Sequence, residues 1–222
     1  MGGDLNGWAR GDRIGPYTVQ RKIGEGWEGV TFVCIDRRLQ DRQTRICTLK
    51  LYRRTNVLAD VRHTVEHWKR FTGLAQVKAL REWSTIAGQR RVSERPYVVF
   101  DYVPGVTLYE KIRRGHIRDP VRLSMKLLWM LAPLHARQVS VGDFDHARNL
   151  IVERGTGRLV VIDLDAGTPG HPPPDMWEDL QEVLLVARKC STHPLPPVLV
   201  KVLSEAPDAI EALRKLSGLI SR

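Results

Sequence analysis

The sequence predicts an α+β fold organised in two lobes, and three observations support this. The first third of the 222-residue chain is rich in short, strand-like runs and contains a single helical stretch. A short connection near residues 103–107 follows, and the remainder is mostly helical, interrupted by one small β-hairpin. Strands and helices segregated along the chain in this way are typical of α+β proteins. We therefore expect a small antiparallel sheet in a first lobe, residues 1–103, and a reduced, mostly helical second lobe, residues 104–222.

Three strands are expected near the N-terminus, and a glycine-rich stretch lies between the first two. The runs are YTVQRKI, VTFVCID and ICTLKLY, at residues 17–23, 30–36 and 46–52. They are rich in β-branched and aromatic residues, as strands commonly are. The stretch GEGWEG, residues 24–29, stands where a hairpin would turn. Lys50 falls inside the third run, where a lysine either snorkels to solvent or requires an anionic partner.

One helix and one buried strand complete the first lobe. Apolar residues recur at helical spacing over residues 57–71. The run YVVFDYV, residues 97–103, is almost wholly apolar and is stopped by Pro104 and Gly105. Trp68 in the helix is expected in the core, as are Trp129 and Trp177 further along the chain.

The second lobe is expected to consist mainly of helices. Thr107 is a suitable N-cap for the first of them, and Pro120 suits the first turn of the second. Two short apolar runs, LIV and LVVI, flank ERGTG and indicate a hairpin. The expected elements are helices over 107–114, 120–137, 175–190 and within 198–220, and a β-hairpin over 150–162.

The formal net charge of +10 arises entirely in the first half of the chain. Residues 1–122 contain 24 Lys and Arg against 13 Asp and Glu, whereas residues 123–222 contain 11 and 12. The simplest interpretation is a solvated basic face, and the alternative is a docking surface for an acidic protein partner. A nucleic-acid partner is less favoured, because no helix-turn-helix or aromatic-interleaved pattern accompanies the charge.

Localisation is predicted from what the chain lacks. No apolar run approaches the roughly 20 residues needed to span a bilayer, and the first thirty residues contain no apolar leader. The three cysteines are widely spaced and do not form a Cys-x-x-Cys pair, so they are interpreted as free thiols. These features predict a cytoplasmic protein.

The order of the elements, together with six motifs, resembles the protein kinase superfamily. In chain order the motifs are Gly24-x-Gly26-x-x-Gly29, Lys50 in LKL, Glu66 in the helix, the run YVVFDYVPG, the pair LH followed by VGD and Asn149, and the run IDLD. They extend over about residues 17–190. The resemblance implies a phosphotransferase that moves the γ-phosphoryl group of ATP to a hydroxyl with the help of Mg²⁺. A protein Ser/Thr acceptor is favoured over a small-molecule hydroxyl.

The resemblance also assigns the nucleotide-binding residues. The three loop glycines would let backbone N–H groups approach the phosphates. Lys50 would contact the α- and β-phosphates, and Glu66 would hold Lys50 in place, with Asp60 as the competing partner. The adenine would lie against Phe100, the gatekeeper, and the backbone of Asp101 and Val103.

The catalytic and metal-binding residues follow in the same way. Asp143 would accept a hydrogen bond from the substrate hydroxyl. Asn149 and Asp163 would offer Mg²⁺ the oxygen ligands that it prefers, with Asp165 as a further acidic ligand near the metal. Asp175 would be the N-cap of its helix and, by the same resemblance, would brace the backbone of the catalytic loop.

The catalytic loop and the metal motif depart from the family pattern. Val141 and Gly142 stand in place of His-Arg. Five residues separate Asp143 from Asn149 instead of four, which leaves Asp145 and His146 as alternative participants. The run IDLD keeps the metal aspartate of D-F-G but loses its glycine.

The segment after Asp163 also departs from the family pattern. About a dozen residues, four of them proline, connect Asp163 to the helix at Asp175. A protein-substrate platform normally occupies this region of a kinase. The alternative to an active enzyme is therefore a pseudokinase, which would act as a nucleotide-binding scaffold or partner-binding module.

Overall fold

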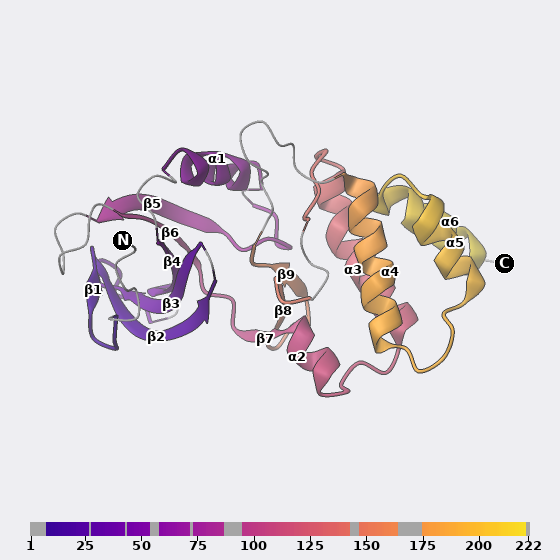
Figure 1. Cartoon of the computed structure of the whole chain (residues 1–222), viewed down its shortest axis with the longest axis horizontal. Helices are drawn as coiled ribbons and strands as arrows, with labels where there is room; N and C mark the ends of the chain where they lie inside the picture. The colour runs from indigo at the N-terminus through magenta and orange to yellow at the C-terminus, as the bar shows by residue number, and fades with distance from the viewer. Residues whose placement is uncertain are drawn as a thin grey trace. The chain divides into compact units, whose positions relative to one another are not determined.

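The computed structural model describes residues 8–26, 28–42, 44–53, 58–71, 73–86, 95–142, 147–163 and 175–220. It shows the predicted α+β, two-lobed architecture (Figure 1). One compact unit comprises Met1–Gly73 and Lys78–Tyr102, and the other comprises Leu74–Val77 and Val103–Arg222. Four residues proposed above for catalysis or metal binding, Asp143, Asp145, His146 and Asp165, lie outside the described residues.

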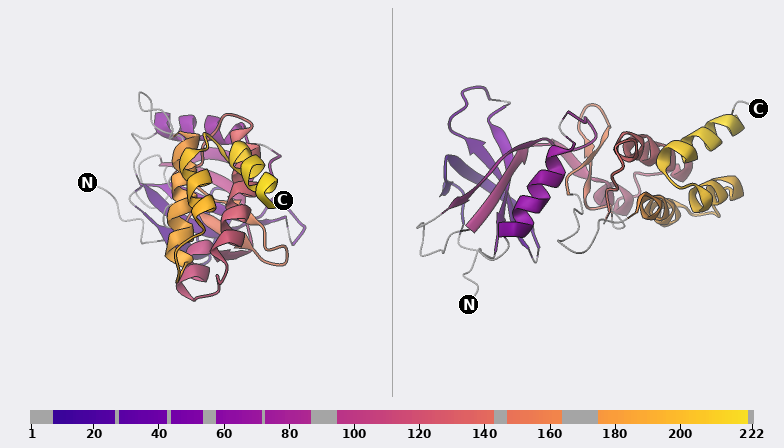
Figure 2. Two further views of the ribbon diagram at one scale, coloured as in Figure 1. Left: turned by 90° about the vertical axis from the view of Figure 1, so that its right-hand side faces the viewer. Right: turned by 90° about the horizontal axis from the view of Figure 1, so that it is seen from above.

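The first unit is built on a six-stranded antiparallel sheet with the strand order β1-β2-β3-β4-β6-β5. The strands are β1 (Arg13–Ile14), β2 (Tyr17–Glu25), β3 (Gly29–Asp36), β4 (Ile46–Tyr52), β5 (Leu80–Ile86) and β6 (Arg95–Asp101), and one helix, α1 (Leu58–Lys69), accompanies them. The sheet curls strongly (Figure 2). Its interior holds fully buried side chains from β2, β3 and β4, among them Tyr17, Phe32, Leu49 and Leu51.

The glycine-rich stretch forms the connection between β2 and β3, as the hairpin prediction requires. Gly29 opens β3 opposite Tyr52 of β4. A Cβ atom at Gly29 would lie 2.3 Å from the carbonyl oxygen of Leu51. The close approach of two strands therefore demands glycine at this position.

The second unit combines a three-stranded antiparallel sheet, in the order β7-β8-β9, with five helices among its described residues. Its elements are β7 (Gly105–Thr107), α2 (Leu108–Arg113), α3 (Pro120–His135), β8 (Leu150–Glu153), β9 (Leu159–Val161), α4 (Met176–Cys190), α5 (Pro197–Glu205) and α6 (Ala209–Ile220). Thr107 caps α2 by accepting a hydrogen bond from Glu110 N, and Pro120 begins α3, both as predicted.

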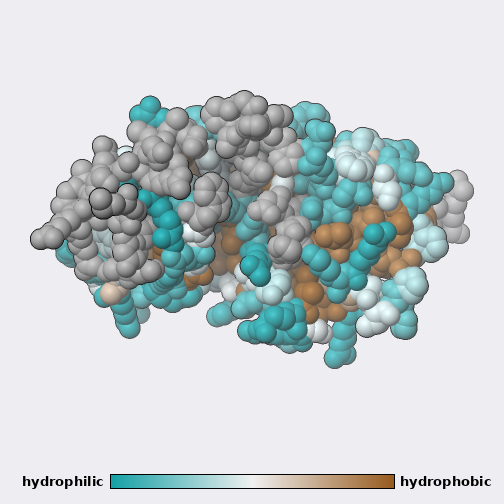
Figure 3. Space-filling model, viewed as in Figure 1, coloured by the Kyte–Doolittle hydropathy of each residue, from teal (hydrophilic) through white to brown (hydrophobic). Residues whose placement is uncertain are grey.

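Helix α3 is the centre of this unit and packs against α4 and α6. Its inward face carries the fully buried residues Leu127, Leu131 and Leu134. Apolar side chains also remain on the surface of the helices (Figure 3). The prediction that Trp129 and Trp177 lie in the core was wrong, because their exposed fractions are 63% and 47%.

The sequence predicted no membrane-spanning segment and no paired cysteines, and both predictions can be compared with the described part of the chain. Within it, the structure shows no helix that is both long and apolar enough to cross a membrane. The three cysteines are free, with Cys34 and Cys47 fully buried. Burial raises the pKa of both thiols, to about 12 for Cys47, so these two cysteines are expected to be chemically inert.

Candidate active site

Lys50 occupies the middle of β4, between Thr31 of β3 and Val98 of β6. Its side chain is 19% exposed, so most of it is shielded from solvent. The Nζ atom lies 2.6 Å from Oε2 of Glu28, a residue of the glycine-rich loop. The prediction that a lysine in this strand would require an anionic partner is thereby confirmed, although the partner is a different one.

Glu66 does not hold Lys50 in the structure. The Glu66 side chain is 68% exposed and pairs with Lys69, one helical turn further along α1, at 2.6 Å. The face of α1 that packs inward presents Val61, Val65 and Trp68 instead. The spacing of apolar residues identifies the buried face of a helix, but it does not identify which polar residue beside that face points toward a neighbouring strand. The prediction that Glu66 holds Lys50 was wrong for this reason.

Ion pairs hold the glycine-rich loop against the end of β4. The carboxylate of Glu25 pairs with Lys22 and with Arg53, and these hydrogen bonds, led by the one from Lys22, lower the pKa of Glu25. Nε of Arg53 donates to the carbonyl of Gly26 at 3.1 Å, and its backbone N–H donates to the carbonyl of Glu28 at 2.8 Å. The loop therefore rests on the strand that carries Lys50.

Gly24 and Gly26 differ from Gly29 in what surrounds them. A Cβ atom at Gly24 would make only ordinary contact with Thr31, at 3.8 Å, and one at Gly26 would meet nothing within 4 Å. Neither glycine has a positive φ. The fold itself does not explain glycine at these two positions, whereas a phosphate group lying against the backbone would.

The predicted gatekeeper, Phe100, is 4% exposed and lies in β6. Its ring centroid lies 4.8 Å from that of Trp68, with the two ring planes tilted by 59°, and the ammonium of Lys78 lies 3.9 Å from the Phe100 centroid. Lys78 is 7% exposed, and sequence reasoning missed it as a buried cation. The one feature of the sequence that could have indicated its burial is its position between the apolar residue Val77 and the start of a strand.

The residues predicted to meet adenine lie close in sequence to Tyr102, the last residue of the first unit. The backbone N–H of Asp101 donates to Ala79 O at 2.8 Å, and its carboxylate pairs with Arg81. Asp101 ends β6, and Val103 begins the second unit as a half-buried residue.

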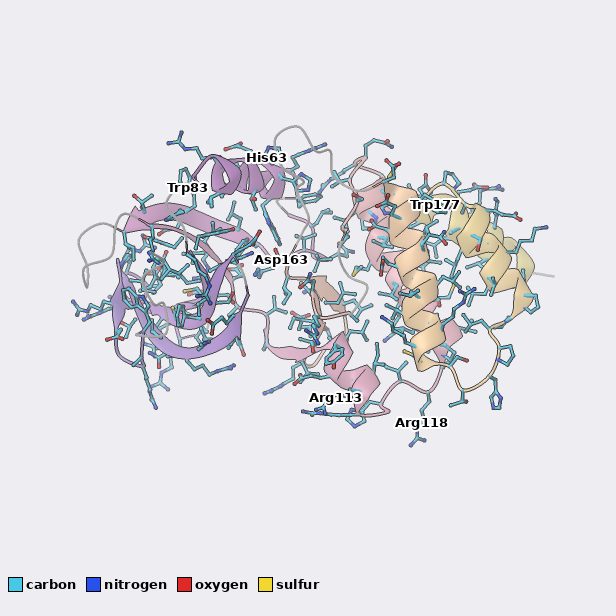
Figure 4. The ribbon with its side chains drawn as sticks, in the orientation of Figure 1. His63, Trp83, Arg113, Arg118, Asp163 and Trp177 are labelled. Atoms are coloured by element: carbon cyan, nitrogen blue, oxygen red, sulfur yellow. The ribbon has the colours of Figure 1, made fainter. Side chains whose placement is uncertain are left out.

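Asn149 and Asp163 lie at the same end of the β8–β9 hairpin. Leu150 pairs with Val161 in the hairpin register, and the carbonyl of Asn149 accepts a hydrogen bond from the N–H of Ile162 at 2.9 Å. Asp163 follows directly and is half-buried (Figure 4). An amide oxygen and a carboxylate from neighbouring chain segments suit the octahedral oxygen coordination of Mg²⁺. The described residues contain no cluster of three or more His, Cys, Asp or Glu side chains.

A buried aspartate holds the backbone that leads into the predicted catalytic loop. Asp179 of α4 is fully buried and accepts hydrogen bonds from the backbone N–H groups of Val141, at 2.7 Å, and Gly142, at 2.9 Å. Asp175 was predicted to have this role. Asp175 does take the N-cap position of α4, but its side chain makes no capping hydrogen bond. The bracing residue is one turn further into the helix.

His135 completes the Asp179 network. Its Nε2 atom lies 2.9 Å from Oδ2 of Asp179, and its Nδ1 atom lies 2.9 Å from the backbone nitrogen of Ala209. Because a backbone N–H can only donate, Nδ1 must be the acceptor, and the proton of the imidazole is assigned to Nε2. A neutral His135 therefore donates to Asp179 and ties α3, α4 and α6 together.

The glycine before Asp143 also has a structural reason. Gly142 has φ of +61°, in the left-handed region that other residues enter at a cost. Ala147, on the far side of the undescribed loop residues, has φ of +53°. Glycine therefore replaces the arginine of the family pattern at a position where the backbone has a positive φ.

A hollow of about 540 Å³ lies elsewhere in the second unit, where α2, the start of α3 and the α4–α5 connection meet. None of the predicted site residues lines it. Figure 4 shows Arg118, one of its lining residues, well away from Asp163. The chemistry predicted from the sequence is therefore not located in this hollow.

The fold is similar to those of bacterial protein kinase domains. The apo form of PpkA-294 matches with a TM-score of 0.67 and 15% sequence identity, over 96% of this chain and 99% of that chain. The kinase domain of Mycobacterium tuberculosis PknI matches with a TM-score of 0.62 and 15% identity, over 96% and 99% of the two chains. A point mutant of the PknI domain matches equally well, over 98% of its length. Sequence comparison alone finds no matching family and no matching curated protein. The chain therefore has a protein kinase-like fold, at an identity too low to transfer an activity.

Proposed function

We propose that this protein, which has the two-lobed fold of a protein kinase, is an ATP-dependent phosphotransferase. The observation that carries the proposal is the placement of Asn149 and Asp163 at one end of the β8–β9 hairpin. In the same unit, the backbone that leads into Asp143 is fixed by a buried carboxylate. A hydroxyl group is the acceptor, and the hydroxyl of a protein serine or threonine is favoured.

The residues present suit ATP and Mg²⁺. Phosphoryl transfer requires a protein mainly to position groups and to balance charge. Lys50 would balance charge on the phosphates, and the backbone near Gly24 and Gly26 leaves room for them. Asn149 and Asp163 would hold Mg²⁺, which offsets the negative charge of the transferred group. Asp143 would accept the hydrogen bond of the acceptor hydroxyl.

A nucleotide-binding pseudokinase is the second candidate. Two observations favour it: Lys50 pairs with Glu28 instead of the helix residue Glu66, and only about a dozen residues follow Asp163 before α4 begins. A short segment offers little platform for a protein substrate. Such a protein would bind Mg·ATP without passing its phosphate to an acceptor.

Transfer of radiolabelled phosphate from ATP distinguishes the two. We expect the wild-type protein to label itself, a protein acceptor or a small-molecule alcohol in a Mg²⁺-dependent way. Asp163→Ala should lower the rate by at least about a hundredfold, because an electrostatic contact made in the transition state is worth about 3 kcal/mol. Glu66→Ala is the matched control and should retain the wild-type rate.

Three outcomes separate the hypotheses. Equal labelling by the wild type and by Asp163→Ala would show that the phosphate transfer comes from a contaminant. Nucleotide binding without transfer to any acceptor would favour the pseudokinase. If calorimetry detects no binding of Mg·ATP at millimolar concentration, neither function is supported.

A further inference from the structure

The geometry points to Glu28 as the residue that positions Lys50 for the nucleotide, a role that the sequence assigned to Glu66. Glu28 belongs to the glycine-rich loop itself, so the loop would control where the lysine points. This inference rests on the proposed function, in which Lys50 serves the phosphates of ATP.

The contact itself is short and direct. Oε2 of Glu28 lies 2.6 Å from Nζ of Lys50, within the range of a charge-assisted hydrogen bond. The lysine is 19% exposed and the glutamate 41%, so one partner is substantially desolvated and the other remains accessible. The ring of Tyr52, 5.3 Å from Nζ, provides a further contact for the same ammonium.

The backbone of Glu28 is fixed on both sides, which makes it a firm support for its side chain. Its carbonyl accepts a hydrogen bond from Arg53 N at 2.8 Å. The next residue, Gly29, is clamped against Leu51, whose carbonyl oxygen leaves no space for a Cβ atom. Glu28 thus lies at the rigid base of the loop, where β3 begins, and its carboxylate reaches the adjacent strand.

The other glutamates near this loop and helix are engaged elsewhere. Glu25 pairs with Lys22 and Arg53, and Glu66 pairs with Lys69 on the outer face of α1. Glu25 and Glu28 therefore have separate tasks. Glu25 ties the loop to the sheet, and Glu28 meets Lys50.

A carboxylate fixed where β3 begins can hold the lysine of the adjacent strand, because β3 and β4 pair in the same sheet. Glu28 acts through Lys50 and makes no contact with substrate in this scheme, so it is a positioning residue.

The first test measures Mg·ATP binding by isothermal titration calorimetry. We expect Glu28→Gln to weaken binding about tenfold, the effect of losing one charge-assisted hydrogen bond that orients the lysine, while Glu28→Asp recovers part of the loss. Glu25→Gln, the matched loop variant, should change the dissociation constant less than twofold. Unchanged binding by Glu28→Gln would overturn the inference. Tighter binding would also overturn it, because it would show that Glu28 competes with phosphate for Lys50.

The second test needs no nucleotide and separates this inference from the proposed function. An acylating reagent reacts with the side-chain amine of lysine, and a carboxylate that holds this group at 2.6 Å restricts the approach of the reagent. Peptide mass spectrometry of the apo protein should show Lys50 labelled several-fold faster in Glu28→Gln than in the wild type or in Glu25→Gln. Equal labelling rates would show that the pair does not form in solution. Faster labelling in a protein that binds no ATP would confirm the pair and overturn its role in nucleotide binding.

Discussion

Asp179 shows how one buried residue fixes a loop. Its two carboxylate oxygens accept hydrogen bonds from two consecutive backbone N–H groups and from His135, all out of contact with water. Four residues earlier, Asp175 has the same side chain and lies at the start of the same helix. Both aspartates lie within the run DMWED, and the prediction from the sequence that Asp175 has the bracing role was wrong. The choice depends on which of them faces α3, which is a matter of packing.

Replacing Asp179 should destabilise the protein strongly. In Asp179→Ala the N–H groups of Val141 and Gly142 are left buried without an acceptor, and each such group costs about 1–3 kcal/mol. We therefore expect the free energy of unfolding, measured with urea, to fall by about 3–5 kcal/mol in total. Asp175→Ala is the control and should change it by less than about 0.5 kcal/mol. Similar losses from both variants would contradict the assignment of Asp179 as the brace.

At the scale of elements, an arginine closes the curled sheet of the first unit. Arg38 follows β3 and pairs with Asp36 at 2.8 Å and with Glu82 of β5 at 3.0 Å, while donating to the Tyr17 hydroxyl of β2 at 2.6 Å. In the strand order, β2 and β5 lie near opposite edges. Arg38 nevertheless contacts both strands, through Tyr17 of β2 and Glu82 of β5.

This network makes stability depend on pH. The hydrogen bond from Arg38 lowers the pKa of Asp36, which is 3% exposed. A depressed carboxyl pKa contributes stability above the unfolded-state value, about 3.9, and that contribution is lost as the pH falls through the folded value. At pH 7 the Arg38→Ala variant should therefore be less stable than the wild type by about 1–2 kcal/mol.

Urea unfolding from pH 7 down to pH 2.5 tests this expectation. The difference between the wild type and Arg38→Ala should shrink below about pH 4, because protonated Asp36 no longer needs the guanidinium. Arg37→Ala, a change at the exposed neighbouring residue, should follow the wild-type curve. A difference that stays constant across this range would mean that Arg38 stabilises the sheet by packing alone.

Most elements of both units could be predicted from the sequence, and those that were missed share a cause. Strands β2, β3, β4 and β6 have buried apolar side chains, α1 has a buried apolar stripe, and α3 has such a stripe with a capped start. The missed strand β5, LREWSTI, is mostly half-exposed and carries charged residues at its start. Strands β1 and β7 have two and three residues. Such strands exist because neighbouring strands pair with them, and their own composition gives little sign of it.

For the molecule as a whole, the proposed function predicts that Mg·ATP stabilises the folded protein. A ligand that binds only the folded protein stabilises it by mass action, by about 1.4 kcal/mol at ten times its dissociation constant. We expect Mg·ATP to raise the melting temperature measured by differential scanning calorimetry. Lys50→Met in the first unit and Asp163→Ala in the second should each abolish most of the rise.

The effects of Lys50→Met and Asp163→Ala on the Mg·ATP-induced rise in melting temperature test the proposed site. Loss of the shift in both variants would support the roles proposed for Lys50 and Asp163. A shift that survives Lys50→Met in full would place the nucleotide away from β4 and would contradict the proposal. Glu66→Ala provides the matched control, since its side chain lies on the outer face of α1.

The sequence by itself determined the order of the helices and of the longer buried strands, the glycine-rich turn between two strands, the lysine within β4 and the cap of α2. These depend on local periodicity, turn chemistry and capping, which act over a few residues. The tertiary structure decided which carboxylate meets Lys50, which aspartate near the start of α4 holds the backbone of Val141 and Gly142, and which tryptophans are covered. Each of these is a question of which neighbour a side chain faces, and only packing between distant segments settles it. Glu66 and Asp175 carried the expected chemistry, but the folded chain puts Glu28 and Asp179 at those contacts.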